Sequence, residues 1–268
     1  VWQLLSFLIG SELLLPSPWA VVRSFCGLAQ TTEFYRSILH TLLRVAAGFA
    51  AGMAAGLLAG TLTAFSRAAD VLLTPLKNII KATPVTSFIV LILLYFSSNV
   101  TPSAVAFLAV LPICWSNVCE GLRQTDKKMT ELAHAYAFGR KKTLREIYFP
   151  AVRPYLSAAA TTGLGFAWKS CVAAEVIALS KNSVGRALYE SKLYLETAEL
   201  FAWTASVVLI SVLFEKLLVR KLFKNKNTEG TAGRRSESLE HGHASCEVEL
   251  QYKSDAYAEY GRDEERNI

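Results

Sequence analysis

The sequence has few charged residues for its length, and two long stretches have none. Only 19% of the 268 residues are charged, whereas 52% are apolar, and the mean hydropathy is +0.31. Residues 45–66 and 82–119 contain no Asp, Glu, Lys or Arg. A membrane-spanning helix needs about 20 predominantly apolar residues. These absences argue against a disordered chain and against an ordinary soluble enzyme, and they predict a multi-pass membrane protein.

The motifs of several enzyme classes are also missing. There is no GxxxxGK[ST] phosphate loop, no HExxH zinc helix and no GxSxG nucleophile elbow. The five cysteines lack CxxC spacing, and only His241 and His243 lie close together among the four histidines. We therefore expect no catalytic centre, no metal site and no disulfide framework, and we interpret the cysteines as packing residues.

The apolar segments predict an all-α bundle of about six transmembrane spans. We interpret the short apolar opening as the end of a first span that begins upstream of Val1. Glycines recur every fourth residue in the second span, which is typical of a small-residue face that lets two helices approach closely. These glycines are Gly48, Gly52, Gly56 and Gly60. The other spans are expected at about 82–96, with a kink at Pro84, and at about 102–119, 154–179 and 200–219.

Charge patterning predicts the domains and the topology. The segment 1–36 is expected to hold the end of the first span and an interfacial part, 37–223 the membrane core with five spans and the loop 120–153, and 224–268 a flexible polar tail. The net charge of +6 divides into +9 before Lys224 and −3 in the tail. The loop 120–153 carries eight basic and four acidic residues, which places it in the cytoplasm by the positive-inside rule.

The same rule gives the remaining connections. The basic turn 67–81 and the tail are expected on the cytoplasmic side, and the connections 97–102 and 180–198 on the outer side. Basic residues that lie between apolar spans set the topology of the chain. We therefore expect the lipid bilayer as a partner, and no nucleic acid.

The loop 120–153 contains two expected short helices. Good helix formers run from Glu131 to Phe138, and Gly139 is expected to end this helix. A second short helix, Lys141 to Tyr148, leads to Pro150. A short, exposed, partly apolar helix between two spans suits docking into a groove of another protein. The alternative is a membrane-surface helix held by basic residues.

This loop resembles the cytoplasmic signature of bacterial ABC-importer permeases, E-A-A-x3-G-x9-I-x-L-P. Glu131, Ala133, Ile147 and Pro150 stand at the signature's spacing. Leu132, Ala137 and Phe149 replace an Ala, the Gly and the Leu of the signature, and Gly139 follows two residues after the expected Gly. Further segments are similar to the nitrate/sulfonate/taurine (bicarbonate) branch of binding-protein-dependent transport components. They are 13–18, 81–85, 154–156, 163–169 and 173–177.

The resemblance implies a type I importer fold in a bacterial inner membrane and a set of partners. Two permease copies, expected to be identical, would form the pathway for a small, anionic solute. A cytoplasmic ABC ATPase dimer would bind ATP and Mg²⁺, so this chain itself would hold no cofactor. An extracytoplasmic binding protein would face residues 180–198. The ATPase-coupling residues would be Glu131, Ala133, His134, Ala137, Gly139, Ile147 and Pro150.

Charges inside the fifth span point to a translocation pathway. Lys169 is the candidate that would attract an anionic substrate, with Trp168 and Glu175 beside it on the same span. The alternative for these charges is an inter-helix bond, or snorkelling to the membrane surface. Lys169 and Glu175 are six residues apart and point about 120° away from each other on a helix, so we expect no direct pair. Arg44, near the outer start of the second span, is expected at the interface.

Two other functions stay open at this point. One is a membrane-embedded enzyme, which the lack of clustered carboxylates or histidines disfavours. The other is a secondary transporter that is driven by an ion gradient and needs no ATPase.

Overall fold

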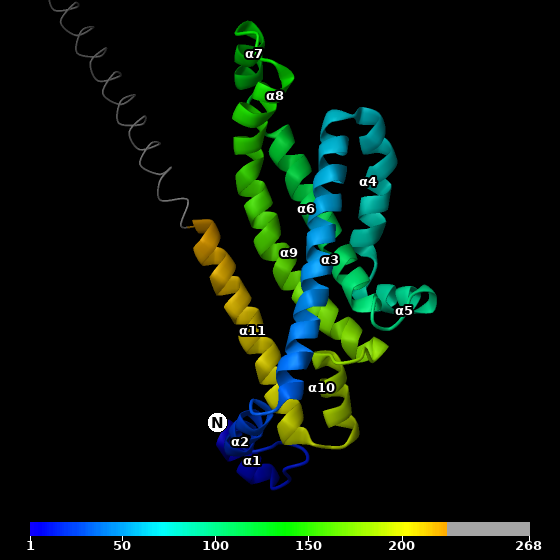
Figure 1. Cartoon of the computed structure of the whole chain (residues 1–268), viewed down its shortest axis with the longest axis vertical. Coiled ribbons are helices and arrows are strands. Elements are labelled where there is room, and N and C mark those ends of the chain that lie inside the picture. Colours follow the sequence, from blue (N-terminus) through cyan, green and yellow to red (C-terminus); the bar gives the residue numbers. More distant parts are fainter. Residues whose placement is uncertain (224–268) are drawn as a thin grey trace, which may run out of the picture. The chain divides into compact units, whose positions relative to one another are not determined.

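The computed structural model describes residues 1–223, so the predicted tail 224–268 lies outside the described residues. The chain divides into Val1–Leu217 and Leu218–Ile268, and the following description concerns the first unit, apart from the last turns of α11. The described part is helical and has no β-strand, which confirms the all-α prediction there (Figure 1). The elements are α1 (Trp2–Ile9), α2 (Pro18–Leu28), α3 (Thr32–Phe65), α4 (Arg67–Ala82), α5 (Val85–Tyr95), α6 (Thr101–Arg123), α7 (Lys127–Ala135), α8 (Arg140–Thr143), the π-helix η1 (Leu144–Tyr148), α9 (Phe149–Ala178), α10 (Val184–Leu193) and α11 (Thr197–Phe223).

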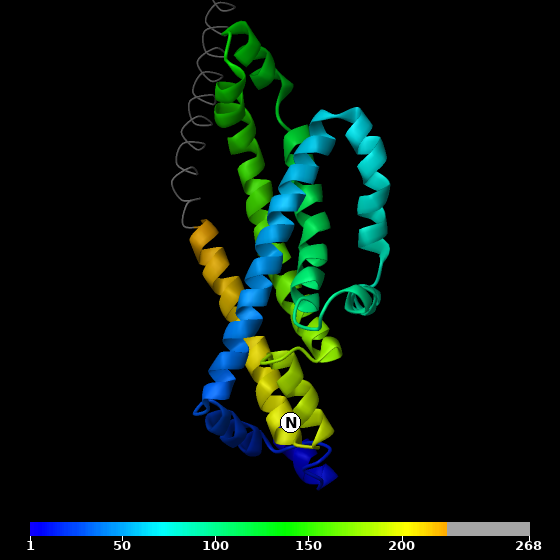
Figure 2. The same ribbon diagram turned by 45° about the vertical axis from the view of Figure 1, so that its right-hand side comes forward.

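Helices α3, α6 and α9 lie side by side and form the centre of the bundle (Figures 1 and 2). The predicted glycine face of α3 is the surface that contacts α6, because all four glycines are buried. A Cβ atom on Gly52 would lie 2.8 Å from the Cβ of Val110, and one on Gly56 would lie 2.6 Å from the Cβ of Cys114. The small-residue pattern therefore gives a close approach of two backbones, as predicted.

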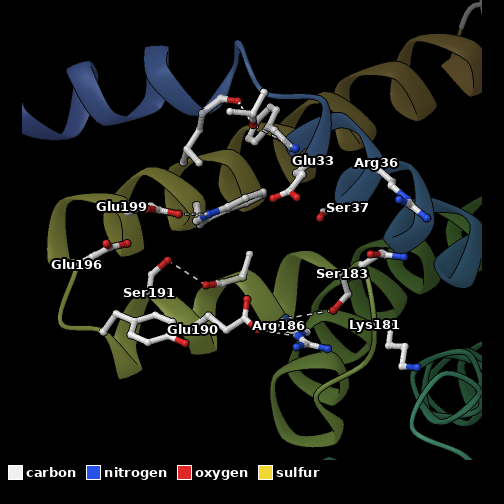
Figure 3. Close-up of a pocket in the computed structure, with 17 residues that line it drawn as sticks. Glu33, Arg36, Ser37, Lys181, Ser183, Arg186, Glu190, Ser191, Glu196 and Glu199 are labelled. Carbon is white, nitrogen blue, oxygen red and sulfur yellow. Dashed lines mark hydrogen bonds and ion pairs between the residues drawn. The ribbon is translucent and has the colours of Figure 1, made fainter.

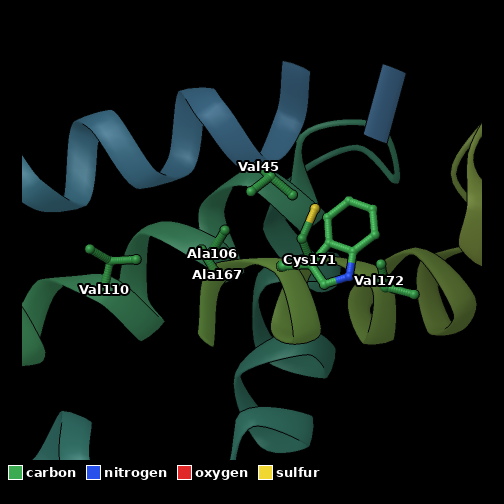
Figure 4. Packing of buried hydrophobic residues seen from close by; sticks show 7 residues of the cluster. Val45, Ala106, Val110, Ala167, Cys171 and Val172 are labelled. Atoms are coloured by element: carbon green, nitrogen blue, oxygen red, sulfur yellow. The ribbon is translucent and has the colours of Figure 1, made fainter. Parts of the chain in front are cut away.

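A hydrophobic core fills the space where these three helices meet (Figure 4). Val45 comes from α3, Val110 from α6, and Cys171 and Trp168 from α9. Cys114, Cys119 and Cys171 are buried and unpaired, which fits their interpretation as packing residues.

Three described helices are long and apolar enough to cross a membrane. They are Thr32–Phe65, Thr101–Arg123 and Thr197–Phe214, and the bent pair α4 and α5 would add a fourth span. Helix α9 has 30 residues, or about 45 Å, and is therefore long enough, but it is less apolar than these three. Length and composition thus give fewer spans in the described residues than the expected six.

The third span differs most from its prediction. The expected turn 67–81 is wrong, since these residues form α4, and the expected kink is a break that bends α4 and α5 by 104°. Thr83 is extended, with φ −77° and ψ 126°, and Pro84 precedes the first turn of α5. Proline disfavours the helical conformation of the residue before it, which is why α4 ends here.

Candidate functional site

The loops of the chain gather at two ends of the bundle. The corner between α3 and α4 lies at the same end as α7 and α8, whereas α1, α2 and α10 lie at the other (Figures 1 and 2). The connection between α5 and α6 joins the α10 end, because the Ser180 hydroxyl donates to the Ser98 carbonyl, at 2.5 Å. The basic loop 120–153 and the start of α4 at Arg67 thus share one end, whereas Lys77 and Lys81 lie farther along α4. The connections predicted on the outer side share the other end.

The loop between α6 and α9 begins with α7, whose end differs from the prediction. The expected helix Glu131–Phe138 with a stop at Gly139 is wrong in its bounds, because α7 spans Lys127–Ala135. Ala137 takes the left-handed conformation, with φ 51°, and the Phe138 amide donates to the Ala133 carbonyl at 2.9 Å. This is the Schellman arrangement, in which the left-handed residue is most often glycine.

Ala137 therefore occupies the position where the resembling signature has its glycine, and the conformation explains the preference for glycine there. Gly139 has a different role. Its carbonyl accepts from the amides of Lys142 and Thr143, at 2.9 and 3.1 Å, so Gly139 begins α8.

The end of the loop is continuous with the next membrane helix. The expected separate helix Lys141–Tyr148 is replaced by α8 and η1, which run directly into α9. Pro150 has no N–H to donate to Glu146, and the Phe149 amide donates to the Leu144 carbonyl five residues earlier. A π-helical turn before the proline accommodates the missing bond. Ile147 is half-buried there, and Pro150 is exposed.

The two sides of α7 differ in exposure. Ala133 is buried, at 4% exposure, whereas Met129, Leu132 and Tyr136 are 55%, 56% and 71% exposed. Glu131 is exposed as well, and the side chain of His134 lies outside the described residues. The three exposed apolar residues follow the i, i+3, i+7 spacing of a single helix face. This apolar face was not singled out from the sequence, although its spacing is visible there.

Two of the proposed pathway residues lie on different sides of α9. Trp168 is 1% exposed, donates from Nε1 to the Val207 carbonyl of α11 at 3.2 Å, and packs edge-on against Phe214. Lys169 is exposed on the described chain. Trp168 thus joins α9 to α11, while the Lys169 side chain is free to meet solvent, a second subunit or a solute.

Glu175 is the most deeply buried charged residue of the described chain, with no exposed surface. Thr41 donates its hydroxyl to the carboxylate at 2.9 and 3.0 Å, and Arg44 forms an ion pair with it at 2.9 Å. The Gly185 amide donates to Oε2 at 3.2 Å. The carboxylate therefore joins α9 to α3 and to the start of α10, and Lys169 is not among its partners, as expected.

The same ion pair extends to the connection between α5 and α6. Arg44 also donates to the Lys181 carbonyl at 2.9 Å and to Asn99 Oδ1 at 3.4 Å, and the Lys181 amide donates to Asn99 Oδ1 at 3.0 Å. Arg44, which we expected at the interface, has a side chain that is only 13% exposed and pairs with Glu175. Sequence spacing could not find a partner 131 positions away.

Gly185 lets α10 approach α9 closely. A Cβ atom at this position would lie 2.6 Å from the Val176 nitrogen and 2.8 Å from the Glu175 carbonyl carbon. Val184 also donates its amide to Thr41 Oγ1 at 3.2 Å. The start of α10 is therefore fixed against both α9 and α3.

A cavity of about 560 Å³ lies beside α10, between the starts of α3 and α11 (Figure 3). Glu196 and Glu199 lie at one side of it and Arg36 and Lys181 at the other, with Glu33 and the pair of Arg186 and Glu190 between them (Figure 3). Arg186 pairs with Glu190 at 2.7 Å, and the Trp203 Nε1 donates to Glu199 at 3.2 Å. The charged lining residues are Glu33, Arg36, Lys181, Arg186, Glu190, Glu196 and Glu199.

Long apolar helices packed around a glycine seam, with a short exposed helix between two of them, define a membrane protein of the transport class. Residues 52–220 match the family described as the binding-protein-dependent transport system inner membrane component. The match covers more than half of the chain, and the chain therefore belongs to this family of transporter permeases, whose members are not themselves enzymes.

Known proteins support this assignment. The chain is 27% identical to the putative aliphatic sulfonates transport permease protein SsuC of Bacillus subtilis, over 85% of this chain and 84% of the relative. It is 31% identical to the riboflavin transport system permease protein RibX of Chloroflexus aurantiacus, over 77% of this chain and 80% of the relative. A crystal structure of an amino acid ABC transporter with histidines shares the fold, with a TM-score of 0.59 and 16% identity, over 72% of this chain and 93% of that chain.

Proposed function

We propose that this chain lines the pathway of an ATP-driven importer for a small anionic solute of the nitrate or sulfonate class. A second copy completes the pathway, and a separate ATPase dimer binds ATP and Mg²⁺. A binding protein delivers the solute at the α10 end, and the tail 224–268 lies in the cytoplasm with α7. The exposed apolar face of α7 carries the proposal.

That face suits docking to a partner better than a place on the membrane surface. Met129 and Leu132 stand on a helix of nine residues at the end of the bundle, beyond the apolar stretches of α6 and α9, and Tyr136 directly follows this helix. The left-handed Ala137 then turns the chain back toward α9. A short amphipathic helix held between two membrane helices can enter a groove and move both helices when the groove moves.

The docking role is tested with two matched tyrosines. Tyr136, directly after α7, is 71% exposed, and Tyr194 is 70% exposed at the other end of the bundle. We expect Tyr136→Asp to weaken co-purification with the ATPase by about thirtyfold, since a central aromatic residue of an interface contributes about 2 kcal/mol or more. Tyr194→Asp will leave ATPase binding unchanged. Equal losses, or none, would contradict the proposal.

The solute class rests on the sulfonate relative's name and on the position of Lys169. Lys169 shares a helix face with Thr162 and Phe166, at i, i+4 and i+7 spacing, and all three are exposed on the described chain. Such a face is open to a solute that passes along α9.

Uptake into proteoliposomes, with the ATPase and the binding protein present, tests the class with nitrate, ethanesulfonate and riboflavin. We expect ATP-dependent uptake of an anion. Uptake of riboflavin alone would overturn the anionic class, and uptake driven by an ion gradient without the ATPase would overturn the importer.

The cavity beside α10 suits the binding protein. It lies at the end opposite α7, and it presents charged groups of both signs, which can orient a protein partner. Charge reversal at Arg36 and Glu196 together should weaken binding-protein-stimulated ATP hydrolysis and leave basal hydrolysis unchanged. An unchanged response would place the binding protein elsewhere.

A further inference from the structure

The break between α4 and α5 leaves a helix start without a side-chain cap. Pro84 precedes Val85, the first residue of α5, and contributes no capping side chain. The Ser87 amide donates to the Pro84 carbonyl at 3.0 Å, whereas the amides of Val85 and Thr86 make no hydrogen bond with the described residues. Such amides carry the partial positive charge of a helix start. In broken membrane helices, such starts point at anionic groups of substrates.

A cavity of about 260 Å³ adjoins this break. Thr83 and Val85 line it from the break, Pro112 from the middle of α6, and Thr162 from the middle of α9. The cavity is therefore about halfway along the two long helices. Its volume is below that of pockets for drug-sized ligands, so it suits a solute of few atoms.

Lys81 lines the same cavity and is the cation of the site. Asp70, Thr74, Lys77 and Lys81 follow the 4, 3, 4 spacing of one face of α4, and the first three have partners. Asp70 pairs with Arg123 at 2.6 Å and accepts from Thr74 at 2.8 Å, and the Lys77 Nζ lies 5.7 Å from the centre of the Trp115 ring.

Lys81 makes no hydrogen bond or ion pair with the described residues. A lysine ammonium at mid-depth in a membrane is costly unless it meets water or an anion. The combination of this cation with the uncapped start of α5 favours a negatively charged ligand.

The Thr83 hydroxyl is not available to a ligand, because it donates to the Ile79 carbonyl at 2.8 Å. We propose that Lys81, the amides of Val85 and Thr86 and the Thr162 hydroxyl form a subsite for the oxyanion group of the transported solute. This inference rests on the proposed function. The charge of Lys81 attracts the anion, and the Thr162 hydroxyl and the amides of Val85 and Thr86 donate hydrogen bonds to its oxygens.

The test measures the local potential and does not require the solute to be known. In the assembled transporter, Thr162→Cys is introduced together with Cys26→Ser and Cys246→Ser, because the other three cysteines are buried. The new thiol is treated with a methanethiosulfonate that carries a sulfonate, and separately with one that carries a trimethylammonium group. The same chain with Thr162 retained gives the background rate.

We expect the sulfonate reagent to react faster than the trimethylammonium reagent. Lys81→Gln should lower the ratio of the sulfonate rate to the trimethylammonium rate by about tenfold or more. Lys81→Arg will keep the ratio. Lys77→Gln removes the same charge one turn earlier, outside the cavity, and will change the ratio by less than about twofold. A ratio that does not depend on Lys81, or a thiol that neither reagent reaches, would overturn the subsite.

Uptake of nitrate and ethanesulfonate separates this inference from the proposed function. If the unaltered transporter takes up an anion, Lys81→Gln should raise its KM by about tenfold, and an unchanged KM would overturn the subsite alone. If the transporter takes up neither anion while the rate ratio still depends on Lys81, the anion-attracting site stands and the proposed solute class fails.

Discussion

Replacing Ala137 by glycine should stabilise the end of α7. The Ala137 side chain is exposed and its φ is 51°, so the substitution removes backbone strain without removing packing. An L-residue in the left-handed region costs about 1–2 kcal/mol, and the greater freedom of glycine in the open loop offsets about 0.5–1 kcal/mol. The net gain in local stability is about 0.5–1 kcal/mol, so the fraction of molecules in which the end of α7 is locally unfolded should fall by two- to fivefold.

This gain in stability is measured as the hydrogen-exchange rates of two amides in the assembled transporter. The Phe138 amide donates to the Ala133 carbonyl, and the Tyr136 amide donates to the Leu132 carbonyl. We expect Ala137→Gly to slow their exchange by two- to fivefold and Ala137→Val to accelerate it, because β-branched residues fit the left-handed region poorly.

Gly139→Ala is the matched control. A Cβ at this residue would meet no atom within 4 Å, and its φ is not positive, so exchange should change by less than about twofold. Slower exchange in Gly139→Ala than in Ala137→Gly would refute the assignment of the helix end.

Three further predictions concern the helix contacts. Gly185→Ala should destabilise the purified chain by about 1–3 kcal/mol and so lower its thermal midpoint, because the new Cβ would lie 2.6 Å from a backbone nitrogen of α9. Gly165→Ala is the control and should leave the midpoint unchanged, because Gly165 has open space around it. Gly56→Ala should act like Gly185→Ala, because its Cβ would lie 2.6 Å from a side-chain carbon of α6; a midpoint equal to that of Gly165→Ala would show that the seam is looser than described. Glu175→Leu should lower the free energy of unfolding by about 3–5 kcal/mol, and adding Arg44→Met should recover part of that loss. A double-mutant cycle on thermal unfolding measures the coupling between the two residues, and strictly additive losses would show that they are not coupled.

Contact faces that depend on a repeat along one helix could be predicted from the sequence. The glycine spacing of α3 identified the face that contacts α6, because a period of four residues fixes a helix side whatever it packs against. The absence of charge in 82–119 identified an apolar region, but only the conformation at Thr83 and Pro84 shows that it contains a broken helix.

Partners distant in the chain could not be predicted. Arg44 and Glu175 meet because α3 and α9 pack together, and neither residue carries a local signal of the other. The role of Ala137 was hidden for another reason. Gly139 is the stronger helix-stop residue by composition, yet the chain turns two residues earlier, where the hydrogen bond from Phe138 to Ala133 closes.

The unbroken run from α8 through η1 into α9 makes this part of the protein a lever. Its α9 section alone is about 45 Å long, so a tilt of about 10° at the α7 end would move the other end by about 8 Å. Glu175 holds that far end to α3 and α10, which places the anchored end of the lever beside the cavity lined by α10. If α7 docks to a partner as proposed, a tilt of this run would carry α3 and the start of α10 with it, because Glu175 ties the far end of α9 to both.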